Sequence, residues 1–182
     1  MPSDAPPNHL TSEDLLARLA AMGIAPVTIR HPPVHTVEEA LPHWAALDAA
    51  HTKNLFLKDA KDQLWLVVAP TDRAIDLKRL PGLIGSKRLS FAREELLFAT
   101  LGVRQGAVSP FALVNDRARR VRLVIDAALM ASPSVAFHPL ANTATTAIAT
   151  ADLRAFLAEI GHAPLVVALD QETEAAAGAA AP

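Results

Sequence analysis

Residues 64–69, Leu-Trp-Leu-Val-Val-Ala, form an uninterrupted apolar run, and this run constrains the fold more than any other feature of the chain. A strand with one face in water alternates apolar and polar residues, and no alternation is present here. The run therefore predicts a central strand that is buried on both faces. Lys53–Leu57 is a second apolar run, and the polar residues 58–63 between the two runs predict a hairpin.

Helix and strand signals alternate irregularly around this hairpin. Thr11 and Asp14 form a capping-box pattern at the start of an amphipathic helix that Gly23 closes. Further helices are predicted at 37–41, 76–80, 91–101 and 151–160, with Thr36, Ser90 and Thr150 as caps. Strands are predicted at 27–30, 111–115, 121–125, 135–137, 145–149 and 165–169. Because few strands are joined by crossover helices, we expect an α+β fold with a mixed, mostly antiparallel sheet.

The length of 182 residues corresponds to about one domain, and no linker divides the middle of the chain. We expect a flexible N-terminus at 1–10, a folded domain at 11–169 and a disordered low-complexity tail at 170–182. The absence of cysteine excludes a thiol nucleophile and a disulfide scaffold. The net charge of −2 argues against a polybasic binder. Without a membrane-length apolar stretch or a secretory signal, we expect a cytoplasmic protein with no membrane partner.

No P-loop, dinucleotide-binding glycine motif, HExxH or GxSxG is present, and weaker features must carry the chemistry. Lys53 opens an apolar strand, where an ammonium group needs an anion or must extend to solvent. Gly106 and Pro110 bracket a tight loop that either turns backbone N–H groups toward an oxyanion or is an ordinary turn. His138 and Asn142 lie in a loop after a strand and supply neutral hydrogen-bonding groups, although His138 can equally cap a turn.

Basic residues also cluster along the chain. They form either a phosphate-binding surface or a solvated hairpin tip, and the candidate phosphate-binding residues are Lys87, Arg88, Arg117, Arg119, Arg120 and Arg122.

The ordered set of these segments resembles the YbaK-like aminoacyl-tRNA deacylase family, the editing domains of bacterial prolyl-tRNA synthetases and their free-standing relatives. The similar segments begin with His-Thr-Val-Glu-Glu-Ala at 35–40 and Lys-Asn-Leu-Phe-Leu at 53–57. They continue with Gly-Ala-Val-Ser-Pro at 106–110, His-Pro at 138–139, Asn-Thr at 142–143 and Gly-His at 161–162. Within the family, the chain is most similar to the free-standing ProXp-ala branch, which clears alanine from mischarged tRNA(Pro).

The resemblance implies a single α+β domain, with a mixed sheet or partial barrel surrounded by helices. It also implies metal-independent hydrolysis of the ester in Ala-tRNA(Pro), without a cofactor, while Pro-tRNA(Pro) is spared. The implied catalytic residues are Lys53, Gly106 and His138. The substrate-binding candidates are Asn54, Ser109, Pro110, Asn142 and Thr36, with Val34, Leu55, Phe56 and Val108 as apolar walls. The expected partners are the acceptor end of tRNA(Pro) and prolyl-tRNA synthetase, and the expected state is a monomer.

Other functions fit the same residues. A deacylase for cysteine or serine esters would share this outline, because the sequence does not fix the cognate amino acid. A non-catalytic tRNA- or synthetase-binding module would keep the fold and the basic face. A small-metabolite-binding domain would use Lys53 to bind a phosphate. The combination of Lys53 with the Gly106 loop favours the deacylase.

Overall fold

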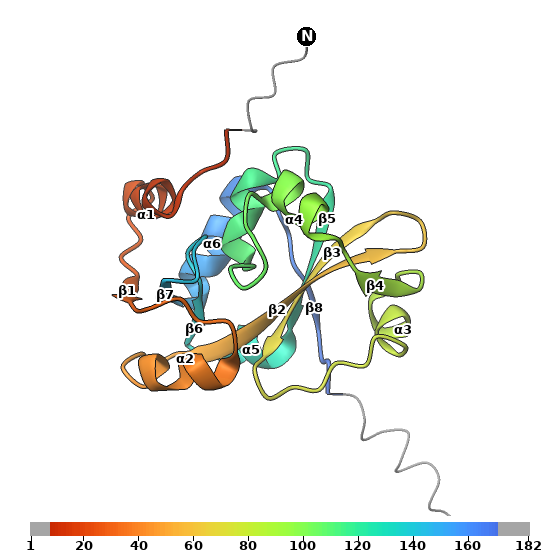
Figure 1. Cartoon of the computed structure of the whole chain (residues 1–182), viewed down its shortest axis with the longest axis horizontal. Helices are drawn as coiled ribbons and strands as arrows, with labels where there is room; N and C mark the ends of the chain where they lie inside the picture. Colours follow the sequence, from red (N-terminus) through yellow and green to blue (C-terminus); the bar gives the residue numbers. More distant parts are fainter. Residues whose placement is uncertain (1–7, 171–182) are drawn as a thin grey trace, which may run out of the picture.

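The computed structural model describes residues 8–170, which form a central sheet covered by helices on both sides (Figure 1). The sheet has eight strands in the order β1-β7-β6-β2-β3-β5-β8, with β4 paired to β2. The strands are β1 (Val27–Arg30), β2 (Ala50–Asp59), β3 (Leu64–Pro70), β4 (Leu89–Phe91), β5 (Val121–Asp126), β6 (Ser134–Phe137), β7 (Ala144–Ala149) and β8 (Leu165–Val167). The helices are α1 (Ser12–Ala21), α2 (Val37–Trp44), α3 (Leu80–Ile84), α4 (Glu94–Leu101), α5 (Ala127–Ala131) and α6 (Thr150–Ile160), with a 3-10 helix, η1 (Pro110–Asn115).

The sheet is mixed, as the sequence predicts. Antiparallel ladders join β1 to β7, β6 to β7, β2 to β3 and β2 to β4. Parallel ladders join β2 to β6, β3 to β5 and β5 to β8. The β2–β3 hairpin lies at the centre, and β2 is the one strand that contacts both the β1-β7-β6 side and the β3-β5-β8 side.

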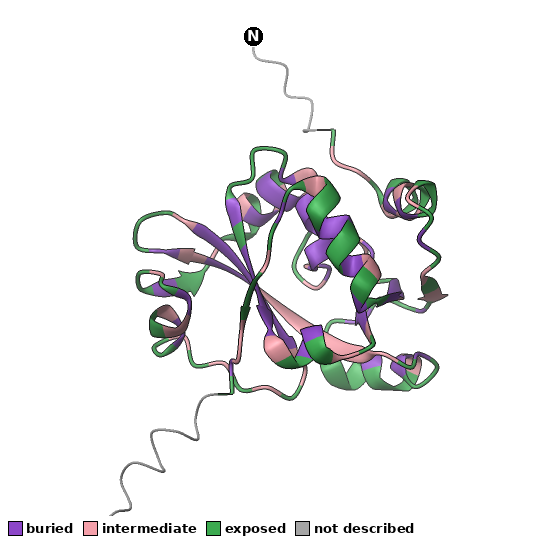
Figure 2. Cartoon of the chain, turned by 180° about the vertical axis from the view of Figure 1, so that it is seen from behind, coloured by how far each residue is buried: buried purple, intermediate pink, exposed green. Residues whose placement is uncertain are grey.

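The apolar run of β3 is buried on both faces, so this prediction is confirmed. Leu64, Leu66 and Val68 belong to the larger core, which α4, α6 and η1 help to form. Trp65, Val67 and Ala69 belong to a second core beneath α3. Figure 2 shows the buried strands between helices whose outer faces are exposed. The continuous apolar pattern thus reflects a sheet with one hydrophobic core on each side.

Three predicted elements differ from the structure. The expected strand at 111–115 is the 3-10 helix η1, because Pro110 fixes its start and the N–H of Ala112 bonds to the carbonyl of Ser109. The expected helix at 91–101 begins only at Glu94, and Ser90 lies in strand β4 instead of capping it. The expected helix at 76–80 is a turn followed by α3. The 150–160 helix forms, but Thr150 lies within it and Ala149 is its N-cap.

The ends of the predicted domain can be compared only in part, because residues 1–7 and 171–182 lie outside the described residues. The packed part of the chain begins before residue 11. His9 contacts the ring of Phe98 edge-on, and the N–H of Leu10 donates to Asn115 Oδ1 at 2.9 Å. No helix between residues 8 and 170 has the length and apolar character needed to cross a bilayer.

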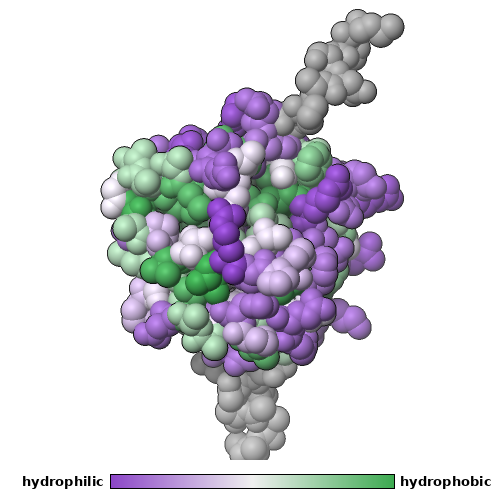
Figure 3. All heavy atoms as spheres, turned by 60° about the vertical axis from the view of Figure 1, so that its left-hand side comes forward, coloured by the Kyte–Doolittle hydropathy of each residue, from purple (hydrophilic) through white to green (hydrophobic). Residues whose placement is uncertain are grey.

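The surface formed by the β1 and α2 side of the molecule carries hydrophobic residues interrupted by hydrophilic ones (Figure 3). Val27 of β1 and Leu41 of α2 are exposed hydrophobic residues of these two elements. Scattered exposed apolar side chains of this kind are normal on a protein surface.

Candidate functional site

A cavity of about 500 Å³ lies where the sheet opens between β6 and β4. Strand β2 pairs with β6 only at Ala50 and His51, and with β4 only from Leu57 to Asp59. The five consecutive residues 52–56 between these ladders all line the cavity. Consecutive residues point to opposite faces of a strand, so a cavity that touches all five must lie along the strand's edge.

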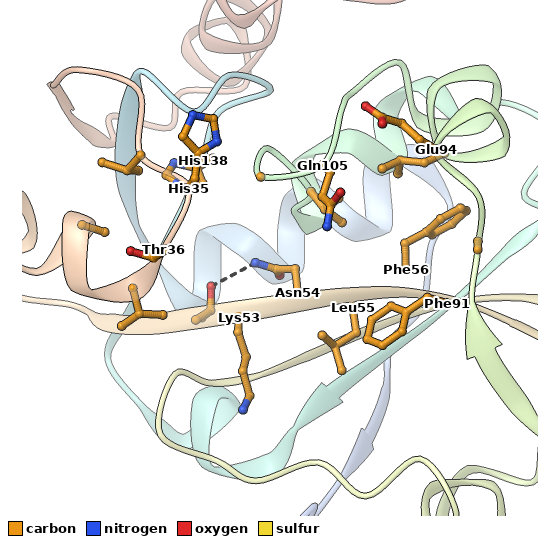
Figure 4. Close-up of a pocket in the computed structure, with 18 of the residues that line it drawn as sticks. His35, Thr36, Lys53, Asn54, Leu55, Phe56, Phe91, Glu94, Gln105 and His138 are labelled. Carbon is orange, nitrogen blue, oxygen red and sulfur yellow. Dashed lines mark hydrogen bonds between the residues drawn. The ribbon is translucent and has the colours of Figure 1, made fainter.

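The two faces of β2 present different chemistry to this cavity. Figure 4 shows Asn54 and Phe56 on one side of the strand, together with His138 and Gln105. Lys53 and Leu55 lie on the other side. The burial pattern agrees, because Phe56 belongs to the larger core and Leu55 packs on the second core. Lys53 therefore lines the cavity from the face opposite to His138.

Lys53 is partly buried and has no ion pair within 4.0 Å among the described residues. Burial lowers the pKa of its ammonium group below the usual value, and the charge of Arg73 acts in the same direction. The carboxylate of Asp72 opposes this shift. An ammonium group in such a position is available to an anion that enters the cavity.

Asn54 carries an unused hydrogen-bond acceptor. Thr52 Oγ1 donates to the carbonyl of Ala136 at 3.0 Å, and Asn54 Nδ2 donates to Thr52 Oγ1 at 3.4 Å. Because the Thr52 hydroxyl proton is already donated to Ala136, Thr52 Oγ1 must accept from Asn54, so the Asn54 amide is oriented with Nδ2 toward Thr52 and Oδ1 away from it. Asn54 Oδ1 is buried and has no partner among the described residues. A buried acceptor of this kind is costly unless a ligand or water supplies a donor.

The backbone of Asn54 is also free of a strand partner within residues 8–170. Thr71 N–H donates to the carbonyl of His51, and Asp59 N–H donates to that of Gln63, so the odd-numbered residues of β2 bond toward β3. In an antiparallel ladder alternate residues bond to opposite sides. The N–H and C=O of Asn54 therefore point into the gap. At the next even-numbered residue, the Phe56 carbonyl accepts a hydrogen bond from Ala92 N–H at 3.1 Å.

His138 lines the cavity as a neutral imidazole. Its Nδ1 lies 2.8 Å from the carbonyl of Ala144, and a carbonyl can only accept, so Nδ1 carries the proton and Nε2 is an acceptor. Burial lowers the pKa of His138 below 6.5; the hydrogen bond to Ala144 opposes the shift, and the nearby His31 reinforces it. The ring of His31 lies 6.0 Å away and stacks on His43 at 5.0 Å.

The Gly106 loop forms another wall of the cavity. Gly106 has a φ of 94°, in the region that favours glycine. Gly106 and Val108 line the cavity, whereas Ser109 and Pro110 lie behind it and are buried. Ser109 Oγ donates to the carbonyl of His138 at 2.9 Å and so ties the two loops together.

Asn142 and Thr36 fix the segment from Val34 to the start of α2, which forms one wall of the cavity. Asn142 Nδ2 donates to the carbonyl of Val34 at 3.2 Å, and Val34 N–H donates back to the Asn142 carbonyl at 3.3 Å. Thr36 caps α2 by accepting from Glu39 N–H. Val34 and Thr36 line the cavity, but Asn142 does not.

Most sequence-predicted site residues therefore meet at one cavity. Lys53, Asn54, Gly106 and His138 line it, with the expected apolar walls Val34, Leu55, Phe56 and Val108. Sequence reasoning missed other lining residues that come from separate segments: Val37, Ala40, Trp44, Thr52, Phe91, Ala92, Glu94, Leu97 and Gln105. Gln105 directly precedes the Gly106 loop, which is the only sequence signal that could have indicated it.

The basic residues are exposed and do not line this cavity. Lys87, Arg120 and Arg122 contact residues of the β2–β3 hairpin, whereas Arg119 lies beside Gly161 and Arg117 lines a separate hollow with His9. Lys87 N–H donates to Asp59 Oδ2 at 3.2 Å, and Gln63 Nε2 donates to the carbonyl of Arg120 at 2.7 Å. Arg122 lies over the Trp65 ring at 5.4 Å. Arg88 follows Lys87, and Arg117 and Arg119 precede Arg120 in the same loop. No cluster of three potential metal ligands occurs within residues 8–170.

Comparison with known proteins gives consistent matches over this region. Residues 31–156 match the model of the aminoacyl-tRNA editing domain family. "Prolyl-tRNA synthetase associated domain-containing protein 1" of Danio rerio is 42% identical over 160 residues, covering 87% of this chain and 85% of that protein. "Prolyl-tRNA editing protein ProX" of Acetoanaerobium sticklandii is 40% identical over 153 residues, covering 81% and 91%.

Solved structures agree on the fold. A crystal structure described provisionally as a trans-editing enzyme for prolyl-tRNA synthetase superimposes with a TM-score of 0.62 and 20% identity. The alignment covers 87% of this chain and 98% of that one.

Proposed function

The chain belongs to the aminoacyl-tRNA editing domain family, and we propose that it is a deacylase that hydrolyses the ester of mischarged Ala-tRNA(Pro) and spares Pro-tRNA(Pro). The observation that carries this proposal is the cavity at the gap in the sheet. It combines a partly buried ammonium, an unpaired amide oxygen, a neutral imidazole and a glycine loop in one space. Ester hydrolysis without a covalent intermediate needs a positioned water and donors for the developing oxyanion, and these groups can orient the substrate and water for that reaction.

The proposed reaction is direct attack of water on the aminoacyl ester. The water oxygen bonds to the ester carbonyl carbon, and the bond from that carbon to the ribose oxygen breaks. Of the two protons of the attacking water, one goes to the ribose oxygen and the other is released to solvent, and the amino acid leaves as a carboxylate. We infer that the Asn54 N–H, together with N–H groups of the Gly106 loop other than that of Ala107, which donates to the carbonyl of Arg104, stabilises the oxyanion that forms.

The side chains hold the substrate around this step. Asn54 Oδ1 offers an acceptor for a substrate hydroxyl or ammonium group, and His138 Nε2 offers a second one. Lys53 reaches from the other face of β2 and is suited to a phosphate or a polarised ester oxygen.

Selection for alanine would be steric. Val34, Phe56 and Val108 are apolar walls next to the polar groups. A ring that overlaps such a wall costs about 1–3 kcal/mol or more, and it also displaces the ester from its donors. An apolar wall discriminates poorly against an added hydroxyl, with a ceiling of about 100-fold. Ser-tRNA is therefore the expected side substrate.

We further propose that the protein acts as a cytoplasmic monomer on the acceptor end of tRNA(Pro), with prolyl-tRNA synthetase as a second partner. The relatives named for prolyl-tRNA editing and for prolyl-tRNA synthetase association support these partners. The exposed basic residues support contact with RNA phosphates outside the cavity.

The test is deacylation of alanyl, seryl, cysteinyl and prolyl esters carried by one tRNA(Pro) body. We expect rapid hydrolysis of the alanyl ester, slower hydrolysis of the seryl ester and none of the prolyl ester. Preference for the cysteinyl or seryl ester would assign the protein to another substrate. Binding of every tRNA without hydrolysis of any ester would identify a non-catalytic module instead.

A further inference from the structure

Phe91 is an unusual residue on the surface of this protein. Of the large hydrophobic side chains exposed within residues 8–170, it is the only aromatic one, with 64% of its surface in solvent. It lines the cavity from the short strand β4. The other exposed large hydrophobic residues lie on β1, α2 and β8. Phe91 is therefore exposed rather than part of a core, and it is the only exposed large hydrophobic residue on β4.

The register places Phe91 on the same face as Lys53. Phe91 lies opposite Leu57 in the antiparallel β2–β4 ladder, and opposite residues project to the same face. Alternate residues of a strand also share a face, so Leu55 and Lys53 join them. Figure 4 shows Lys53, Leu55 and Phe91 on one side of β2, while Asn54 and Phe56 lie on the other.

Three cations lie close to Phe91 in the sequence. Lys87, Arg88 and Arg93 are exposed on either side of it. Two carboxylates follow in α4: Glu95 is exposed, and Glu94 lines the cavity 3.7 Å from Arg104, which offsets its charge. The exposed aromatic ring is thus set in basic surroundings, with the Lys53 ammonium on the same face.

A solitary aromatic ring among cations is the arrangement that binds single-stranded nucleic acid, where the ring stacks on a base and the cations meet the backbone. Protein–protein interfaces are also enriched in aromatic residues and Arg, but they are depleted of Lys, and here Lys53 lines the same cavity while Lys87 lies four residues before the ring. The surroundings of Phe91 therefore favour RNA over a protein partner.

We propose that Phe91 is a stacking platform for an unpaired base at the acceptor end of the tRNA, with Lys53 facing the adjoining phosphate on the same side of β2. This inference rests on the proposed function, since the aminoacyl end must enter the same cavity. The ester would then lie toward the Asn54 face and the nucleotide toward the Phe91 face. Strand β2 would separate the chemistry from the recognition of the RNA.

The test is the affinity of an uncharged acceptor-stem hairpin with its unpaired 3′ nucleotides. Phe91→Ala is expected to raise its Kd about 5- to 150-fold, the range for loss of one stacked base. Phe91→Trp should bind about as well as the wild type. Leu165→Ala removes another exposed hydrophobic side chain, on β8 and outside the cavity, and should leave the Kd unchanged.

Abasic substitution at each of the unpaired 3′ nucleotides identifies the stacked base. At one of these nucleotides, removal of the base should raise the Kd of the wild-type protein but change the Kd of Phe91→Ala little. Independent effects at all of them would overturn the proposal. So would an unchanged hairpin affinity combined with weaker binding of prolyl-tRNA synthetase, which would identify a protein-binding residue.

These outcomes are separate from those of the proposed function, because the hairpin carries no ester. Hydrolysis of Ala-tRNA without base coupling at Phe91 would refute the stacking platform alone. Base coupling without hydrolysis of any ester would refute the deacylase and support the RNA contact.

Discussion

Gly106→Ala is the most informative single substitution at the cavity. The φ of 94° lies where an L side chain is strained, and this costs about 1–2 kcal/mol. A Cβ at this position would meet Asn142 Nδ2 at 3.8 Å and the Val34 carbonyl at 4.0 Å, which are ordinary contacts. Because these contacts do not hold the loop at a positive φ, we expect the loop to relieve the strain by rotating toward a negative φ, which turns its N–H groups away from the cavity.

The structure supplies a matched control for that strain. Gly85 ends α3 with a φ of 73°, and a Cβ there would meet nothing within 4 Å. Gly85→Ala should lose a similar 1–2 kcal/mol of the free energy of unfolding, or about 2–8 °C in Tm, with unchanged hydrolysis. Gly106→Ala should lose no more stability than this, because rotation of the loop relieves part of the strain, and its kcat should fall at least about 10-fold, toward the 100-fold that removal of one oxyanion donor produces.

The assay is single-turnover hydrolysis of Ala-tRNA(Pro) by both variants at a temperature well below their Tm values. If Gly106→Ala and Gly85→Ala are equally active, the loop does not contribute donors to the reaction. That result would refute the reasoning, because both substitutions place a side chain at a positive φ and only Gly106 lies at the cavity.

Three further predictions follow from the charged and titrating groups. Lys53→Ala should remove most of the hydrolysis with little change in Tm, because it deletes a cation whose burial already lowers its pKa. Lys58→Ala, which removes an exposed i,i+4 ion pair, is the control, and equal activity of the two variants would refute a role for Lys53. Since the pKa of His138 is lowered in the folded state, the unfolded chain binds more protons and the free energy of unfolding should fall as pH drops below 6.5. A titration that is identical in His138→Asn would show that another group is responsible. The Kd for tRNA should rise with salt, and Arg88→Ala should reduce the slope of log K against log salt by about 1, whereas an unchanged slope would place Arg88 away from the phosphates.

The hairpin and the layered core could be predicted because they depend on local pattern. The run at 64–69 has no polar position, and the polar residues 58–63 that separate it from a second apolar run favour a hairpin strand between two cores. The capping box at Thr11 and Asp14 likewise forms as expected. These features are set by neighbouring residues, which the sequence displays directly.

Elements set by distant contacts could not be predicted in the same way. Residues 110–115 are mostly apolar and buried, and the sequence pattern of such a short run does not distinguish a strand from a helix. The three residues of β4 form a strand because they pair with β2, and nothing in Ser90 or Phe91 alone indicates this. The same pairing places Phe91 at the cavity, which explains why the sequence did not reveal it.

In the candidate site, too, the choice of residues follows from local sequence, whereas their arrangement depends on contacts between distant segments. Lys53 and His138 could be chosen from the sequence, but their opposite positions relative to β2 depend on which residues bond to β3. Asn54 could be chosen too, yet its unpaired Oδ1 follows from the hydroxyl of Thr52 being used by Ala136, a contact between separate strands.

The central claim is tested most directly by single-turnover hydrolysis of Ala-tRNA(Pro) and Pro-tRNA(Pro) made from the same transcript. With enzyme in excess, product release does not limit the observed rate, so the comparison reports the chemical step and the fit of the amino acid. The account predicts that the alanyl ester is cleaved at least about 100-fold faster than the prolyl ester. Equal rates for the two esters, or faster cleavage of the prolyl ester, would contradict it.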